Sequence, residues 1–503
     1  MLVSLSKTLV DCQQVCYSGS VRREESQDAV VPDTMPDVGA ILSTTGCVLI
    51  RSKEVGEGRV RLEANVPARV LYRPEDGGPV RCLEIQIPFY VNLEDPQIPE
   101  GSVCRTTLRL TALETRLLNP RKVSVRAELL CSVVCYAPGQ LSCCGAPAEA
   151  PEFLNLRERP VPISAVCAVT EKTFVLTDEF SIPETRGPAT ALLAQHTALQ
   201  VEELRQSGSK LILRGSAESA LSYLDENGQV GDVRFTTAFS QILELNSLPE
   251  ETAADAEVLL SGAYYDLEEG TGLTGTMELH LVAQVRVWEK RTLSLLTDAY
   301  CNRYPLETER EPLALDSIAR TLTLRETLRE NFPTGQQAAE TLQAWAEVGE
   351  ARSDPEGLQV PVTVILYYLT GEGELCAARH SYTVPLRTPL EPGERLELLS
   401  AGVPELNLTP APGGAELRLT LEARVMVLST RTLEAVTALR YDETAPLDQS
   451  QRPSLTLLLA DPAGDLWDLA RENCSTPQAI RDANPAGDAA KEAVRWLLIP
   501  KIV

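Results

Sequence analysis

The stretch VRLEANVPARVLY, residues 60–72, decides the fold class of this protein. An apolar or aromatic side chain stands at every second position, at Val60, Leu62, Ala64, Val66, Ala68, Val70 and Tyr72. The residues between them include Arg61, Glu63, Asn65 and Arg69. Because side chains alternate between the two faces of a strand, the pattern predicts a long strand with one buried and one solvated face.

A turn and a second alternating segment follow this stretch. Residues 73–77, RPEDG, have a composition typical of turns. Apolar residues then alternate again between Leu83 and Phe89. The two segments together predict an antiparallel hairpin.

The same arrangement occurs three times along the chain. Alternating segments recur at residues 211–223 and 360–368, and each copy ends at a tyrosine followed by a glycine-containing turn. These marker tyrosines are Tyr72, Tyr223 and Tyr368. A second alternating strand follows each of them at a nearly constant interval, with Ala127, Ala283 or Ala423 at its centre. Two landmarks at similar spacing indicate three repeats of a mostly antiparallel β unit, with the tyrosines as structural landmarks rather than ligands.

A short helix is expected before the first long strand of each copy. Prolines and Asp37 precede residues 38–42, where the apolar spacing becomes helical. The second copy has a comparable pattern at residues 182–193. In the third copy, residues 312–332 and 336–348 both have helical spacing, which predicts extra helices in a divergent unit.

Three segments of the first copy resemble a known family. They are DAVVPDTMPDVGAIL at 28–42, LYRPEDG at 71–77 and EIQIPFYVNLE at 84–94. These segments are similar to the SPOCS domain of spore-forming Firmicutes, which is also catalogued as a domain of unknown function. The resemblance covers about residues 10–140, and the internal repeat extends it to about 160–290 and 295–445.

The last 50 or so residues follow a linker at 445–453 and have a different pattern. The expected elements are a strand at 455–459, a helix capped by Asp465, a helix capped by Ser475 and Thr476 that stops at Asn484 and Pro485, and a strand at 496–499. This order, β-α-α-β, and the sequences GDLWDLARENCSTPQAIRDANPAG (464–487) and LLIPK (497–501) resemble a LysM domain. The resemblance implies two helices packed on a two-stranded sheet.

The expected architecture is therefore mainly β with minor α. It consists of three tandem antiparallel β-rich SPOCS-like domains at 1–150, 151–294 and 295–444, followed by a small β-α-α-β LysM-like domain at 454–503. The third SPOCS-like domain is expected to be divergent and to contain the extra helices.

The LysM resemblance also implies a binding groove. The residues expected to line it are Pro462, Gly464, Asp465, Leu466, Trp467, Asn484, Pro485, Ala486 and Gly487. The loops at 462–465 and 491–495 depart from the family pattern, and these loops hold N-acetylglucosamine chains in glycan-binding members. Glycan recognition is therefore open, and Trp467 has a second interpretation as a core residue of the small unit.

SPOCS-like repeats combined with a LysM-like module are similar to a family of clostridial spore-coat morphogenetic adaptors. The resemblance implies a non-enzymatic scaffold in the mother-cell cytoplasm, at the forespore surface. Its LysM-like module would bind stage IV sporulation protein A, the ATPase that polymerises on the outer forespore membrane, and so promote coat encasement. Other coat proteins are further candidate partners. The alternative is a peptidoglycan-binding protein of the cell or spore envelope that holds N-acetylglucosamine polymers.

Composition restricts the classes of partner. The formal net charge is −25, from 71 acidic and 46 basic residues, so nucleic acid and anionic lipid surfaces are disfavoured. No apolar run approaches the roughly 20 residues of a membrane-spanning helix. The first residues lack an export pattern, and the 13 cysteines are irregularly spaced, so we expect reduced thiols in a cytoplasm.

No catalytic, metal or cofactor site is expected from the sequence. The three histidines fall in different repeats, and the cysteine pairs lack the spacing of zinc ligands. Residues 270–275 do match the glycine pattern of a dinucleotide site. An alternating strand follows them where that site requires a helix, so a hairpin loop is the prediction.

Overall fold

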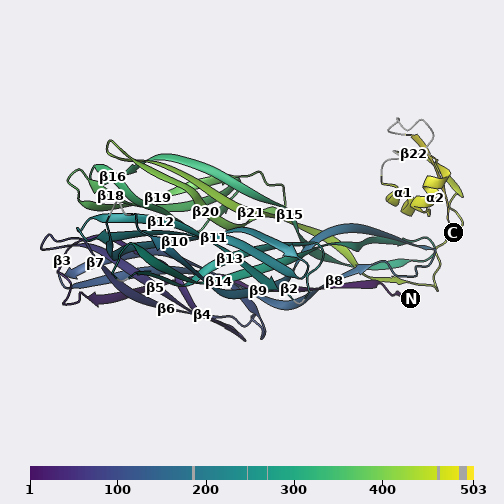
Figure 1. The fold of residues 1–503 in the computed structure, drawn as a ribbon. Helices are drawn as coiled ribbons and strands as arrows, with labels where there is room; N and C mark the ends of the chain where they lie inside the picture. The colour runs from purple at the N-terminus through teal and green to yellow at the C-terminus, as the bar shows by residue number, and fades with distance from the viewer. Residues whose placement is uncertain (184–186, 246, 269, 461–464, 486–494, 503) are drawn as a thin grey trace.

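The computed structural model describes residues 1–183, 187–245, 247–268, 270–460, 465–485 and 495–502. Figure 1 shows a long body made of β-sheets, with a small unit that contains two helices at one end. Both ends of the chain lie at that same end of the body. The expected class, mainly β with minor α, is confirmed.

Eight strands form the first third of the body. They are β1 (Leu2–Val3), β2 (Ser6–Val30), β3 (Val38–Gly46), β4 (Leu49–Gly56), β5 (Arg59–Pro74), β6 (Arg81–Glu94), β7 (Val103–Asn119) and β8 (Lys122–Gly145). In one sheet, β5 is the central strand and pairs with β3, β4 and β6. The other sheet has the order β2-β8-β7. The short strand β1 pairs with a strand of the last third. The stretch at 60–72 lies in β5 and pairs with β6 from Val60↔Leu93 to Tyr72↔Arg81, which confirms the hairpin.

The rest of the body repeats this strand order twice. The middle third contains β9 (Leu154–Ser181), β10 (Ala189–Ser207), β11 (Lys210–Asp225), β12 (Val230–Glu244), β13 (Thr252–Leu267) and β14 (Thr274–Cys301). The last third contains β15 (Leu306–Pro333), β16 (Ala338–Val348), β17 (Arg352–Asp354), β18 (Gly357–Thr370), β19 (Leu375–Arg387), β20 (Glu394–Ala411) and β21 (Gly414–Tyr441). The central strands of their sheets are β11, β14, β18 and β21.

The sequence landmarks occupy equivalent places in the three parts. The marker tyrosines lie on the central strands β5, β11 and β18, and the alanines on the central strands β8, β14 and β21. All six residues are buried. The expected border between residues 294 and 295 falls inside β14, which continues to Cys301 and pairs with β9 to its end.

The helices expected in the body were wrong, because these segments are strands. Residues 38–42 belong to β3, 189–193 to β10, 312–332 to β15 and 336–348 mostly to β16. In the part of the chain that the structure describes, the helices are confined to residues 466–483.

Paired β-bulges explain most of these errors. The strands β3, β10 and β16 each pair with a central strand and shift register twice within six residues, at 38/40 and 41/43, at 189/191 and 192/194, and at 338/340 and 341/343. A bulge inserts one extra residue into a strand, so apolar side chains on one face become three residues apart. That spacing is also the spacing of a helix face, and a sequence pattern does not distinguish the two.

The remaining predictions on local structure held. Residues 270–275 connect β13 to its antiparallel neighbour β14, so the glycine pattern lies in a hairpin loop. The C-terminal unit has the expected order, with β22 (Leu455–Ala460), α1 (Leu466–Glu472), α2 (Pro477–Ala483) and β23 (Arg495–Pro500). Its helices pack their apolar side chains against one face of the β22–β23 sheet.

Candidate functional site

The first helix of the C-terminal unit begins at the predicted cap. The Asp465 side chain accepts a hydrogen bond from the backbone N–H of Trp467 at 3.1 Å. An acceptor at this position satisfies one of the free N–H groups of the first turn. That hydrogen bond lowers the pKa of the Asp465 carboxyl, and Arg157, whose guanidinium lies 2.7 Å from the carboxylate, lowers it further.

The side chain of Trp467 lies between the small unit and the body. The residue is 7% exposed, and its ring meets the Tyr300 ring edge to face, with the centroids 4.8 Å apart. Its Nε1–H donates a hydrogen bond to Asp298 Oδ2 at 2.7 Å. Tyr300 and Asp298 are among the last residues of the strand β14, which ends at Cys301.

Three further contacts complete this docking interface. Arg471 on α1 forms an ion pair with Asp298. The Tyr300 hydroxyl donates to the Ser475 carbonyl at 2.9 Å, and Asn302 Nδ2 donates to the same oxygen at 3.1 Å. Burial raises the pKa of Tyr300, so the hydroxyl keeps its proton at neutral pH and remains a donor. The α1 side of the unit is therefore held against the body by aromatic, ionic and hydrogen-bond contacts.

Asn484 joins the second helix to the sheet. Its Nδ2 donates to the Ile480 and Leu498 carbonyls at 2.7 and 2.6 Å, and its Oδ1 accepts from the Leu498 backbone at 2.8 Å. Both partners are backbone groups, which makes Asn484 the cap of α2 and its tie to β23. Its neighbour Pro485 is exposed.

The structure places only part of the groove expected from the sequence. Asp465, Leu466, Trp467, Asn484 and Pro485 are described, and Leu466 and Trp467 are buried. The other expected residues, Pro462, Gly464, Ala486 and Gly487, lie outside the described residues.

The residues of the body that hold the small unit had no signal in the sequence. Arg157 and Asp298 are register partners on β9 and β14, and the two carry opposite charges toward α1. Asp298 and Trp467 are 169 residues apart. No local pattern links residues at that separation, so only the folded chain identifies the contact.

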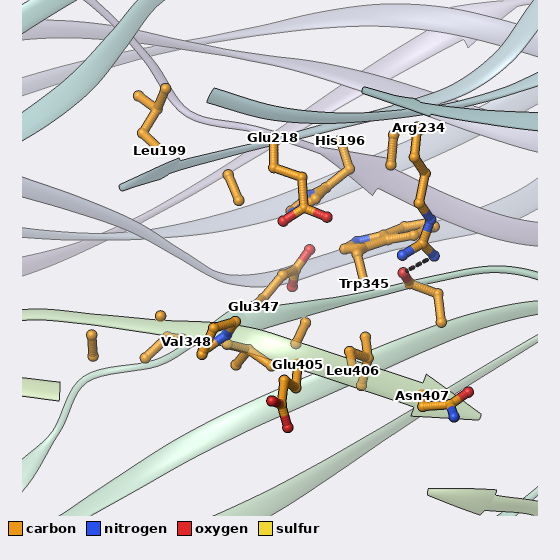
Figure 2. Close-up of a pocket in the computed structure, with 18 of the residues that line it drawn as sticks. His196, Leu199, Glu218, Arg234, Trp345, Glu347, Val348, Glu405, Leu406 and Asn407 are labelled. Carbon is orange, nitrogen blue, oxygen red and sulfur yellow. Dashed lines mark hydrogen bonds between the residues drawn. The ribbon is translucent and has the colours of Figure 1, made fainter. Parts of the chain in front are cut away.

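A separate cavity of about 680 Å³ lies between the middle and last thirds of the body. Figure 2 shows His196, Glu218 and Arg234 entering it from one side and Glu405 and Asn407 from the other. The His196 ring stacks on Trp345 at 5.6 Å between centroids. The Arg234 guanidinium donates a hydrogen bond to the Ala344 carbonyl at 2.6 Å, which is the dashed contact in the figure.

Two of the titratable groups that line this cavity have shifted pKa values. Burial lowers the pKa of His196 to about 4, and the nearby Arg234 acts in the same direction. Burial raises the pKa of Glu347, against the opposing effect of Arg379 at 3.2 Å. The lining contains neither a hydroxyl nor a thiol side chain.

The described ranges contain neither a metal-binding cluster nor a helix that could span a membrane. No cluster of three or more histidine, cysteine or acidic side chains there could hold a metal ion. None of the helices within those ranges has the length and apolarity needed to cross a bilayer.

Comparison with known proteins gives one match. The family model described as "SipL, SPOCS domain" matches residues 37–118, which correspond to β3 through most of β7. No curated protein and no solved structure matches the chain. The match relates this part of the chain to the SipL family, and it suggests a protein connected with sporulation.

Proposed function

We propose that this protein is a non-enzymatic adaptor in the assembly of the endospore coat. It binds stage IV sporulation protein A through its C-terminal LysM-like unit and promotes encasement of the forespore by the coat. It acts in the mother-cell cytoplasm, at the forespore surface. The observation that carries the proposal is the SPOCS-domain match at residues 37–118 in a chain that ends in a β-α-α-β unit.

The geometry of the small unit supports a binding role. The unit has an apolar core that it shares with Tyr300 of the body; its own members are Leu466, Trp467, Ala470, Ile480, Leu497 and Ile499. It stands at one end of the long body, so a partner can reach it without displacing a sheet. A long β-body with a small unit at its end suits a protein that bridges two other components.

The direct test is affinity capture with purified components. The full chain and a chain that ends at residue 453 are immobilised and incubated with stage IV sporulation protein A. We expect retention by the full chain and loss of retention after truncation. Equal retention by both chains would refute binding through the small unit, and thermal unfolding of the truncated chain controls for damage to the body.

A second arm of the experiment tests the glycan alternative. Both chains are sedimented with insoluble peptidoglycan, which carries N-acetylglucosamine. The adaptor proposal predicts that the full chain stays in the supernatant. Pelleting that depends on residues 454–503 would support the peptidoglycan-binding function instead.

A further inference from the structure

The body already covers part of the side of the small unit that was expected to bind. Trp467, one of the residues expected to line the groove, packs on Tyr300 and donates its Nε1–H to Asp298. Asp465, another of them, forms an ion pair with Arg157 at 2.7 Å. A partner that contacts these two residues must therefore displace the body from them.

The docking contacts are of a kind that can be released. The side chains of Arg157, Asp465 and Arg471, which form the ion pairs of the interface, are 28%, 50% and 40% exposed. Ion pairs between such partly exposed groups stabilise only weakly, because water screens the charges. Polar contacts between two parts of one chain ordinarily permit relative motion. We therefore expect a minor population of chains in which the small unit is undocked.

The segment between the body and the small unit keeps the two parts close. Residues 442–454 contain no helix or strand. The backbone N–H of Leu447 within this segment donates to the Arg303 carbonyl of the body at 3.0 Å. A short tether gives the body a high effective concentration at the small unit, so an undocked unit docks again readily. A free partner therefore competes with a surface that is always present.

The body residues at the interface indicate which chemistry a competing partner needs. Undocking leaves the Trp467 Nε1–H and the Arg471 guanidinium without the Asp298 carboxylate. It also leaves the indole ring without Tyr300. A partner that excludes water from these groups without replacing their contacts leaves polar atoms unpaired, which is costly. The surface therefore suits a protein segment that carries a carboxylate beside an aromatic ring.

We propose that docking to the body is autoinhibitory. The protein partner of the proposed function binds the same α1 side of the small unit, with a carboxylate and an aromatic ring in place of Asp298 and Tyr300. The inference rests on that function. Only undocked chains are competent to bind, so the apparent affinity is the intrinsic affinity reduced by the undocked fraction. Substitutions that weaken docking should raise the apparent affinity.

The test uses the full chain with substitutions in the body, so the binding surface of the small unit is untouched. Arg157→Glu places a like charge beside Asp465, and Asp298→Asn removes the counterion of Arg471. Arg440→Glu is the matched control, because it makes the same charge change as Arg157→Glu and breaks an exposed ion pair within the body. Thermal unfolding checks that each variant keeps its fold.

Tryptophan fluorescence measures the undocking itself. The chain has four tryptophans, and Trp496→Phe removes the exposed one. The other three, Trp288, Trp345 and Trp467, are 4%, 5% and 7% exposed, so acrylamide quenches little of their fluorescence in the docked chain. In this background we expect Arg157→Glu and Asp298→Asn to increase the quenching, because Trp467 leaves the body. Arg440→Glu should not change the quenching.

Affinity for immobilised stage IV sporulation protein A is measured for each variant without Trp496→Phe. We expect Arg157→Glu to bind at least about threefold more tightly than the unsubstituted chain, since a larger fraction of the chains is undocked. Asp298→Asn should change the affinity in the same direction. Arg440→Glu should bind as the unsubstituted chain does.

The outcomes separate the inference from the function on which it rests. If neither the unsubstituted chain nor any variant binds, the proposed function is wrong and the inference falls with it. If the chain binds, and the variants expose Trp467 without a gain in affinity, the function stands and docking is not inhibitory. Weaker binding by Arg157→Glu and Asp298→Asn would mean that the body is part of the partner's surface. Unchanged quenching in both would mean that docking is not releasable, and each of these results overturns the inference.

Discussion

Trp467 and Trp496 belong to the same small unit and have opposite surroundings. Trp467 is 7% exposed, with its ring against Tyr300 and its Nε1–H on Asp298. Trp496, which pairs with Leu459 in the β22–β23 sheet, is 62% exposed. At the scale of single residues, one tryptophan of this unit is thus part of the docking interface and the other is exposed.

This difference predicts opposite effects of one substitution. Trp467→Ala should destabilise the small unit by about 3 kcal/mol, because it removes a buried aromatic ring and leaves Asp298 without that donor. Trp496→Ala should change stability by no more than about 0.5 kcal/mol. Native-state hydrogen exchange of the amides in α1 and α2 measures both. Similar protection in the two variants would contradict the assignment of Trp467 to the interface.

His196 supplies a second residue-scale prediction. Burial lowers its pKa to about 4, while an unfolded imidazole titrates near 6.5. Between these values the unfolded chain binds a proton that the folded chain does not, so stability is complete above about pH 6.5 and declines as pH falls toward 4.

His196→Gln should reduce this acid sensitivity. The unfolding midpoint of the variant should fall less steeply than that of the unsubstituted chain between about pH 6.5 and 4. Glu347, whose raised pKa gives a slope of the opposite sign, is present in both proteins and cancels in the comparison. Parallel pH profiles would show that His196 titrates normally in the folded state.

At the scale of elements, regular strands of the body were predicted from their sequence pattern and bulged strands were not. The alternation in β5 and in the central strands was readable because the strands are regular and one face is buried. The strands β3, β10 and β16 were misread as helices because two bulges each interrupt the alternation. A bulge depends on pairing with a neighbouring strand, and the local sequence does not contain that neighbour.

The caps of the two short helices were predicted for the opposite reason. Asp465 and Thr476 each accept a hydrogen bond from a backbone N–H within three residues. Such a contact is local, so the residue type in the sequence is enough to predict it. Two of the described residues of the expected groove make contacts that the sequence does not predict. Trp467 contacts Asp298 of the body, and Asn484 contacts Leu498 of β23.

At the scale of the whole molecule, one buried arginine joins the three parts of the body. Arg286 of the middle third contacts Asp255 at 3.2 Å, the Tyr136 hydroxyl of the first third at 3.0 Å, and Glu397 of the last third. Arg105 of the first third also forms an ion pair with Asp255, at 2.7 Å. These charges are paired with one another, so the network holds the repeats in one arrangement.

Loss of this arginine should therefore destabilise the whole body. Arg286→Met leaves Glu397 and part of Asp255 without a buried counterion, which costs about 3 kcal/mol. Arg395→Met breaks the exposed pair with Asp316 and should leave the denaturation midpoint unchanged. Urea unfolding of both variants provides the comparison. An equal response would mean that the network contributes no more than a surface ion pair.

The sequence by itself determined the β class, the hairpin around residues 60–72, the threefold repeat of landmarks and the β-α-α-β order of the last unit. Each of these is encoded in the period of side chains along one segment or in a contact within a few residues. Only the tertiary structure decided that the bulged segments are strands, that Trp467 faces the body, and that a leucine-rich face of β22–β23 is left exposed. Those features depend on which distant segments meet, and a linear pattern of residue types does not specify that.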